Sequence, residues 1–146
     1  MVTDQAARES PSKPKSSTRC HWPRHILPST NGTLSVFDIT NEVSREVVHG
    51  GVGAGIAYVT ANARSGLVRV TERESGFFCD FEDLLARLVP LQTEQRERLL
   101  MMLLGPRTEG IPFADSRLCL GQWQRVLLFG FNGDSRADWS VHVIGS

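Results

Sequence analysis

The chain has 146 residues, of which 40% are hydrophobic and 22% charged, and this composition is typical of one ordinary globular domain. Sixteen basic residues balance sixteen acidic ones, so no net field favours nucleic acid or an anionic membrane as a partner. The apolar runs are too short to span a bilayer and the N-terminus lacks the apolar core of a secretory signal, so a cytoplasmic protein is expected.

The first segment, residues 1–23, is rich in Ser, Pro, Lys and Arg and nearly devoid of aliphatic side chains. Such a segment buries too little apolar surface to offset the entropy lost on ordering. A disordered N-terminal tail is therefore predicted, followed by one domain over residues 24–146. The cationic side chains of the tail could contact an anionic partner, although a solvated tail is the simpler interpretation.

The domain is predicted to begin with two short strands, at residues 24–27 and 33–37, joined by a Ser-Thr-Asn-Gly turn. A helix follows, opened by Asp38 or Thr40, whose side chains can accept hydrogen bonds from the first free amide groups. Gly50-Gly51 ends it. Three apolar side chains at a spacing of four share one face of this helix: Ile39, Val43 and Val47.

The middle of the chain is predicted to form two strands, at residues 55–61 and 67–72, separated by a turn at 64–66. An amphipathic helix is then expected over residues 80–88, and Pro90 stops it. Its apolar face is predicted from the spacing of four side chains: Phe81, Leu84, Leu85 and Leu88.

The remainder begins with a helix over residues 93–104, capped by Thr93, and continues as β-structure. Alternation indicates a strand around residues 118–120, and the long apolar run at 123–131 predicts a central strand. A strand at 139–144 then returns. Because Asn132-Gly133 is a strong turn signal, the last two strands could pair as a hairpin.

The irregular order of strands and helices predicts an α/β protein of the α+β type, with a mixed or antiparallel sheet and helices packed on it, and excludes a doubly wound parallel sheet. Gly50 to Gly55 is glycine-rich, but it follows a helix and precedes a strand, which is the wrong order for a phosphate-binding loop. Three cysteines and four histidines are scattered without ligand spacing. No metal site and no cofactor are therefore expected.

An ordered set of motifs over residues 25–145 resembles the YjbQ-like family of small α/β proteins. The matching segments are Asp38-Ile-Thr (DIT), Gly53 to Val59, Asp80 to Pro90 (D-L-x-x-x-L-x-x-L-x-P), Leu103-Leu-Gly105 (LLG), Leu118-x-Leu-Gly-x-Trp-Gln124 (L-x-L-G-T-W-Q) and Gly130 to Arg136. The resemblance implies a twisted sandwich that assembles as a homotrimer, with a polar pocket near the subunit boundary. It also implies secondary thiamine-phosphate synthase activity, in which a pyrimidine group is transferred onto a thiazole phosphate.

The chain departs from the family where histidines are expected. The family signature H-T-T/S-A falls on Ala63, Arg64 and Ser65, so its histidine is replaced by alanine. The signature H-x-K-x-x-L-L-G places Arg98 at its histidine and Leu100 at its lysine. Neither alanine nor arginine can exchange a proton near neutral pH. The resemblance combined with these losses predicts an enzyme with weak or lost activity, a pseudoenzyme.

Two acidic residues remain at family-like positions and are the catalytic candidates, Glu72 and Asp80, although Asp80 could simply cap a helix. Trp123 is expected to pack at a boundary between sheet and helix. The arginines could converge on a phosphate or carboxylate through bidentate hydrogen bonds, or could be ordinary salt-bridge partners. The candidate ligand-binding residues are Arg64, Ser65, Arg98, Arg117, Gln124 and Arg136.

Three hypotheses follow from these residues. The first is a trimeric module that binds an anion, such as a phosphate-containing small molecule, with little or no catalysis. The second is a true synthase in which Glu72, Asp80 and the arginines compensate for the missing histidines. The third is a scaffold whose basic tail contacts a partner.

Overall fold

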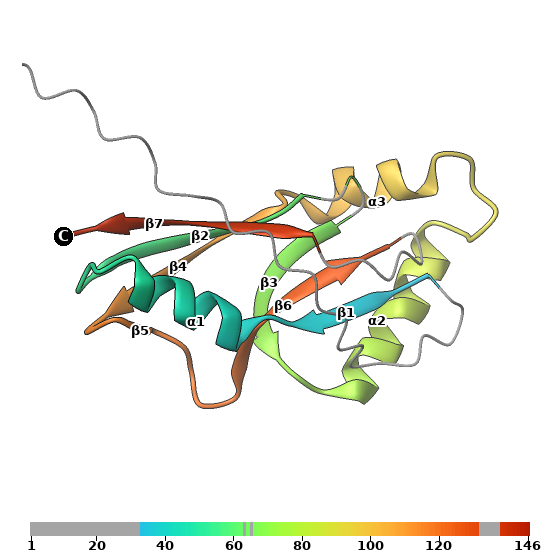
Figure 1. Cartoon of the computed structure of the whole chain (residues 1–146). Helices are drawn as coiled ribbons and strands as arrows, with labels where there is room; N and C mark the ends of the chain where they lie inside the picture. Colours follow the sequence, from blue (N-terminus) through green and yellow to red (C-terminus); the bar gives the residue numbers. More distant parts are fainter. Residues whose placement is uncertain (1–32, 63, 65, 132–137) are drawn as a thin grey trace, which may run out of the picture.

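The computed structural model describes residues 33–62, 64, 66–131 and 138–146 (Figure 1). The predicted tail at 1–23, the strand predicted at 24–27 and the Asn132-Gly133 turn lie outside these residues. The described elements in chain order are β1 (Ser35–Asp38), α1 (Thr40–His49), β2 (Gly55–Ala61), β3 (Gly66–Glu72), α2 (Ser75–Leu88), α3 (Arg96–Leu104), β4 (Thr108–Ala114), β5 (Arg117–Leu118), β6 (Gln124–Gly130) and β7 (Trp139–Gly145).

The strands form two antiparallel sheets, one of three strands in the order β1-β6-β3 and one of four in the order β5-β4-β2-β7. The predicted α+β class with an antiparallel sheet is thus confirmed. The apolar run predicted as a central strand is β6, and it does lie at the centre of its sheet.

The strand β6 is buried on both faces, which makes its sheet the middle layer of the molecule. Val126 and Leu128 pack toward the four-stranded sheet, in one core with Ala57, Val59 and Trp139. The alternate side chains of β6 pack on the opposite side, in a second core that α2 and α3 help to form: Leu127 and Phe129. The alternation of a strand sends successive side chains to opposite faces, so an unbroken apolar run fits only this doubly covered position.

The helix α1 agrees with its prediction. It runs from Thr40 to His49 and Gly50-Gly51 follows it. The three side chains predicted to share a face are all buried, with exposed fractions of 4%, 0% and 0%: Ile39, Val43 and Val47. They close the edge of the core between the two sheets.

The helix α2 begins at Ser75, five residues before the predicted start at residue 80. Glu74 precedes it, and its carboxylate accepts hydrogen bonds from the amide groups of Gly76 (2.8 Å) and Phe77 (2.5 Å). Such a carboxylate satisfies free amides and favours the positive end of the helix dipole. The interpretation of Asp80 as the cap is therefore wrong, and Asp80 is an exposed residue inside the helix.

The buried face of α2 is also rotated from the predicted one. Phe78 and Leu85 are 0% and 3% exposed, whereas Leu84 and Leu88 are 46% and 61% exposed. The ring of Phe78 packs edge-on against Phe129 of β6, with 5.8 Å between ring centroids. That contact with the sheet selects the phase of the helix, because both faces carry enough apolar residues to look amphipathic in the sequence.

The start of α3 differs too. Thr93 was the expected cap, but the helix begins at Arg96, and Gln95 precedes it with a positive φ of 57°. The guanidinium of Arg96 is buried and donates from Nε to the carbonyl oxygen of Val89 (2.8 Å). This bond draws the chain after α2 into the turn from which α3 starts.

The hairpin predicted between residues 123–131 and 139–144 is wrong. Both edges of β6 are taken, by β1 and β3, and β7 instead pairs along its whole length with β2 in the other sheet. Strand β4, which had no separate prediction, fills the other edge of β2. A turn signal in the sequence predicts only where the chain reverses. The strand with which the next strand pairs depends on which strand edges are still unpaired in the folded protein.

The expected packing of Trp123 is also wrong, because its side chain is 67% exposed. The tryptophan of the core is Trp139, which is 1% exposed and lies between the sheets. Trp123 stands in the turn before β6, where Gln124 holds Gly121 through its side chain (2.7 Å). In the described part of the chain, no helix has both the length and the apolar character needed to cross a membrane.

The rotational phase of α2, meaning which of its faces is buried, is tested by replacing a buried leucine and an exposed leucine of the helix with alanine. Leu85→Ala should lower the free energy of unfolding by about 2–5 kcal/mol, because it leaves a cavity beneath the helix. Leu88→Ala should change it by less than about 1 kcal/mol. Urea unfolding followed by circular dichroism measures both. Equal losses, or a larger loss for Leu88→Ala, would contradict the observed phase.

Candidate functional site

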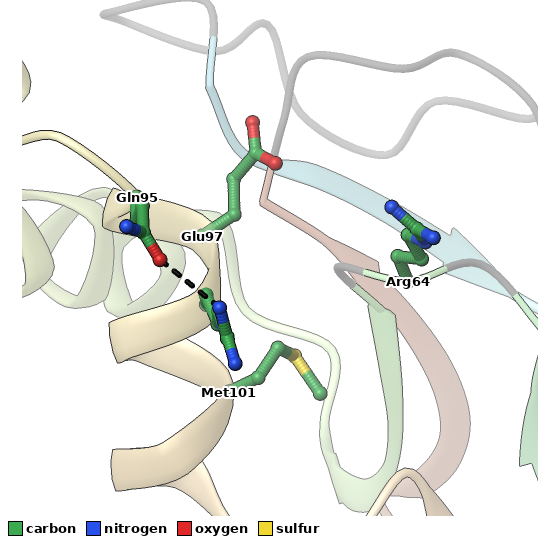
Figure 2. A pocket seen from close by; sticks show the side chains of 5 residues that line it. Arg64, Gln95, Glu97 and Met101 are labelled. Carbon is green, nitrogen blue, oxygen red and sulfur yellow. Dashed lines mark hydrogen bonds between the residues drawn. The ribbon is translucent and has the colours of Figure 1, made fainter.

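A cavity of about 550 Å³ lies between the start of α3 and the connection from β2 to β3 (Figure 2). Arg64 comes from that connection and faces α3 across the cavity, as Figure 2 shows. Four lining residues come from α3 and the residue before it: Gln95, Glu97, Arg98 and Met101. Two of the six ligand-binding candidates, Arg64 and Arg98, therefore share one cavity.

The α3 side of the cavity follows from helical spacing. Gln95, Arg98 and Met101 are three residues apart, so they lie above one another on one face. The side-chain oxygen of Gln95 accepts a hydrogen bond from Nη1 of Arg98 (3.1 Å). This bond orients the guanidinium along the cavity wall. Gln95, Glu97 and Met101 were not among the predicted site residues, although the spacing around Arg98 would have identified Gln95 and Met101.

The cavity carries more positive charge than its own carboxylate neutralises. Between described residues, the two pairs of charged groups closer than 4.0 Å both involve Asp38, with Arg73 and with Arg125. No described carboxylate therefore lies within 4.0 Å of the guanidinium nitrogens of Arg64 or Arg98. Glu97 lines the same cavity without pairing with either. Two guanidinium groups that lack counter-ions form a site at which a phosphate or carboxylate would receive several N–H donors.

The remaining candidates lie elsewhere. Glu72 ends β3 opposite Gln124 of β6, about 20 Å from the Arg64 end of that strand by strand geometry. Asp80 is exposed on α2, and Arg117 pairs with Ala114 at the edge of the other sheet. Three positions of interest lie outside the described residues: Ala63, Ser65 and Arg136. Within one protomer the described candidates thus form separate groups.

Asp38 of the DIT motif ties β1, α1 and β6 together and does not face the cavity. Its Oδ1 accepts from the amide (3.1 Å) and hydroxyl (2.6 Å) of Thr40, and its Oδ2 accepts from Nε of Arg125 (2.8 Å) and Nη1 of Arg73 (3.5 Å). The Thr40 hydroxyl oxygen in turn accepts from the amide of Val126 (2.9 Å). The motif therefore has a structural role, and these bonds around Asp38 are called the Asp38 junction below.

Burial raises the pKa of the Asp38 carboxyl group, but hydrogen bonds from Arg125 and Thr40 outweigh burial and hold the pKa below its ordinary value of 3.8. The side chain is only 8% exposed. Its charged form is therefore the one that the fold stabilises.

The LLG motif also has a structural role, at the end of α3. Gly105 ends α3 with a φ of +84°, a conformation that favours glycine. The guanidinium of Arg69 on β3 donates to the carbonyl oxygens of Leu104 (2.5 Å), Pro106 (3.1 Å) and Val68 (2.7 Å). The end of α3 is thereby fastened to the three-stranded sheet, which places the start of the helix beside Arg64.

The described residues offer little for metal or acid–base chemistry. They contain no group of three His, Cys, Asp or Glu side chains arranged to hold a metal ion. The two described histidines, His49 at the end of α1 and His142 on β7, do not line the cavity. Among the described lining residues, the two arginines are the cationic groups that could donate hydrogen bonds to an anion.

Comparison with known proteins gives consistent results. The sequence model of the family "UPF0047 protein YjbQ-like" matches residues 25–146. A UPF0047 protein of Archaeoglobus fulgidus is 30% identical over 109 residues, covering 68% of this chain and 83% of the relative. Another, from Methanothermobacter thermautotrophicus, is 25% identical over 125 residues, covering 80% and 87%.

Solved structures share the fold. A YjbQ/UPF0047 family protein from Clostridium acetobutylicum superposes with a TM-score of 0.73 at 21% identity, covering 87% of this chain and 99% of that one. A protein of unknown function from Sulfolobus solfataricus also gives 0.73, at 18% identity, covering 90% and 97%. At these identities the likeness speaks for the fold alone.

The Asp38 junction predicts a pH dependence of stability. A carboxyl group whose folded pKa is depressed adds stability above its unfolded pKa of about 3.9, and this stability is lost as the pH falls toward the folded pKa. Asp38→Asn should lower the free energy of unfolding at pH 7 by about 1–3 kcal/mol, and the difference from the wild type should shrink below about pH 4.

The measurement is urea unfolding at a series of pH values. Asp83→Asn, at an exposed carboxylate of α2, is the matched control and should change the free energy by less than about 0.5 kcal/mol. A deficit of Asp38→Asn that stays constant down to pH 2 would show that the charge of Asp38 plays no part.

Proposed function

The chain belongs to the YjbQ-like UPF0047 family, and we propose that it is a divergent member that binds a phosphate-containing small molecule, with thiamine-phosphate synthase activity weak or lost. One observation carries the proposal. Arg64 and Arg98, contributed by two separate segments, line one cavity, and neither has a carboxylate partner among the described residues. Two like charges that line one cavity without counter-ions repel each other, and a bound anion would offset that repulsion.

The lining suggests how such a ligand would be held. The guanidinium of Arg98 is oriented by Gln95 (3.1 Å) and can present a fork of N–H groups to phosphate oxygens, with Arg64 on the opposite wall. Met101 offers an apolar, polarizable surface to the carbon skeleton of the ligand. Glu97 would repel a second anionic group or accept from a donor, so it favours ligands with one phosphate end.

The proposal of weak or lost catalysis rests on the residue types at two positions of the sequence. The two positions at which the family resemblance implies histidine hold Ala63 and Arg98. Arginine remains protonated throughout the physiological range, so it can stabilise charge but cannot act as a general base. The same replacement that removes the proton carrier at residue 98 supplies a phosphate ligand.

The alternative is a working synthase in which Glu72 and Asp80 act in place of the histidines. Within one protomer neither residue lines the cavity. Glu72 lies at the far end of β3, and Asp80 is exposed on α2. The geometry of the protomer therefore favours binding over catalysis.

We also propose the homotrimer that the family resemblance implies. Several large apolar side chains of the protomer face outward, and α3 contributes three of them, with exposed fractions of 45%, 82% and 64%: Leu99, Met102 and Leu103. Exposed apolar side chains that lie together on one helix favour an assembly in which another subunit covers them.

Binding of phosphate should raise the melting temperature, because a ligand that binds only the folded state stabilises it by mass action. Thermal unfolding in increasing inorganic phosphate, against chloride at equal ionic strength, should show a shift in the wild type. Arg64→Ala and Arg98→Ala should each reduce the shift strongly. Arg117→Ala, at an arginine outside the cavity, is the control and should retain it. No shift in the wild type, or equal losses in all three variants, would contradict the proposed site.

Restoring the histidines tests the lost catalysis. The double variant Ala63→His/Arg98→His should form thiamine phosphate from the pyrimidine and thiazole phosphate substrates faster than the wild type, because an imidazole can carry a proton near pH 7. A wild type that is already active, and that loses this activity in Glu72→Ala/Asp80→Ala, would instead support the synthase hypothesis.

A further inference from the structure

One carboxylate shares the cavity with the two arginines. Glu97 lines the same cavity as Arg64 and Arg98, and in the described part of the chain it forms an ion pair with neither. We propose that Glu97 makes the site selective for an organic phosphate that also carries a protonated amine, with the phosphate at the two arginines and the amine at Glu97. This inference rests on the proposed function, because it requires that the arginines hold a phosphate.

The local geometry of α3 keeps the carboxylate of Glu97 apart from Arg98. Adjacent residues of a helix point about 100° apart around its axis, so these two side chains do not face each other. Arg98 is bonded instead to the side-chain oxygen of Gln95, through Nη1 at 3.1 Å. The described residues supply neither a hydrogen bond nor an ion pair to the Glu97 carboxylate. This carboxylate can therefore accept hydrogen bonds from a ligand.

The side chains of α3 give the cavity wall a polar part and an apolar part. Met101 lies three residues after Arg98 and four after Glu97, so the three share the helix face that lines the cavity. Figure 2 shows the carboxylate of Glu97 on one side of this wall and the thioether of Met101 on the other, with Arg64 across from them. A ligand held by the arginines therefore meets an anionic group in one direction and an apolar surface in the other.

The size of the cavity indicates a ligand with more atoms than a phosphate group. Its volume is about 550 Å³, which falls within the range of roughly 300–1,000 Å³ that small-molecule sites occupy. A bare phosphate would leave most of this space empty. The further atoms of an organic phosphate would extend along the α3 wall, where Glu97 and Met101 are the side chains that they would contact.

The charges of the cavity balance for such a ligand. Arg64 and Arg98 carry two positive charges and Glu97 one negative charge, so the lining has a net charge of +1. An organic phosphate carries about −1.5 to −2 charges at pH 7, which would make the filled site negative. A protonated amine beside Glu97 brings the total close to zero, whereas a second phosphate there would be repelled.

This class of ligand differs from the thiazole phosphate that the family resemblance implies, because a thiazole ring is not protonated near neutral pH. The carboxylate of Glu97 would gain little from such a ring. It would gain a charge-assisted hydrogen bond from an ammonium group. Glu97 is therefore the residue at which selectivity for the amine can be measured.

Two ligands of the same shape test the role of Glu97. O-phosphoethanolamine carries a protonated amine where propyl phosphate carries a methyl group. Isothermal titration calorimetry of the full chain should give a dissociation constant roughly five-fold lower for O-phosphoethanolamine, as expected for one partly exposed ion pair. Glu97→Gln should abolish this preference, because the amide has no charge. Glu94→Gln, at an exposed carboxylate that does not line the cavity, is the matched control and should retain it.

Titration with inorganic phosphate separates this inference from the anion site itself. Glu97→Gln should bind inorganic phosphate at least as tightly as the wild type, because a repelling charge is removed, and this binding also shows that the variant is folded. If the wild type binds inorganic phosphate but does not distinguish the two organic ligands, the role of Glu97 is overturned while the anion site stands. A preference that survives in Glu97→Gln, or that Glu94→Gln also loses, overturns it as well. If inorganic phosphate does not bind the wild type, the anion site falls and the inference falls with it.

Discussion

The burial of β6 on both faces is the constraint on which the rest of the structure depends. Its apolar run can be satisfied only by a layer on each side, so one face requires the four-stranded sheet and the other requires α2 and α3. Both of its edges are also paired, which sends β7 to the second sheet. The two ends of β6 lie at defined positions for this reason. At the first end, Gln124 and Arg125 are bonded to Gly121 and Asp38. At the other end, Gly130 pairs with Gly66, close to Arg64 of the cavity.

The family motifs Asp38-Ile-Thr, Leu103-Leu-Gly105 and Trp123-Gln124 have structural roles, and two of the positions at which the chain departs from the family, Arg64 and Arg98, line the cavity. Asp38 joins three elements, Gly105 allows Arg69 to fasten α3, and Gln124 closes the turn that exposes Trp123. Each of these interactions is needed whatever the ligand. The residues at the cavity can change without cost to the fold, because Arg64 and Arg98 are exposed there and form no part of either core.

Charge is distributed unevenly between these two kinds of position. The two ion pairs between described residues both involve Asp38, which is 8% exposed and whose pKa the bond from Arg125 helps to hold below its ordinary value. The arginines of the cavity have no such partner, and neither has Glu72 at the opposite end of β3. The described charges of the protomer are thus paired at its internal junction and unpaired at the two ends of β3.

The sequence by itself determined the class of fold, most strand positions and the buried face of α1, because alternation and helical spacing are local properties. It also named Arg64 and Arg98 among several candidate ligand-binding residues, and the structure places these two at one cavity. Only the tertiary structure decided the phase of α2, the sheet to which β7 belongs, and the exposure of Trp123. Leu84 and Leu85 are equivalent by spacing, and contact with Phe129 selects between the two faces. Likewise, Trp123 and Trp139 are the same residue type, so their chemistry does not show which of them is buried. Trp139 lies in the core because β7 pairs with β2, whereas Trp123 lies in the exposed turn before β6.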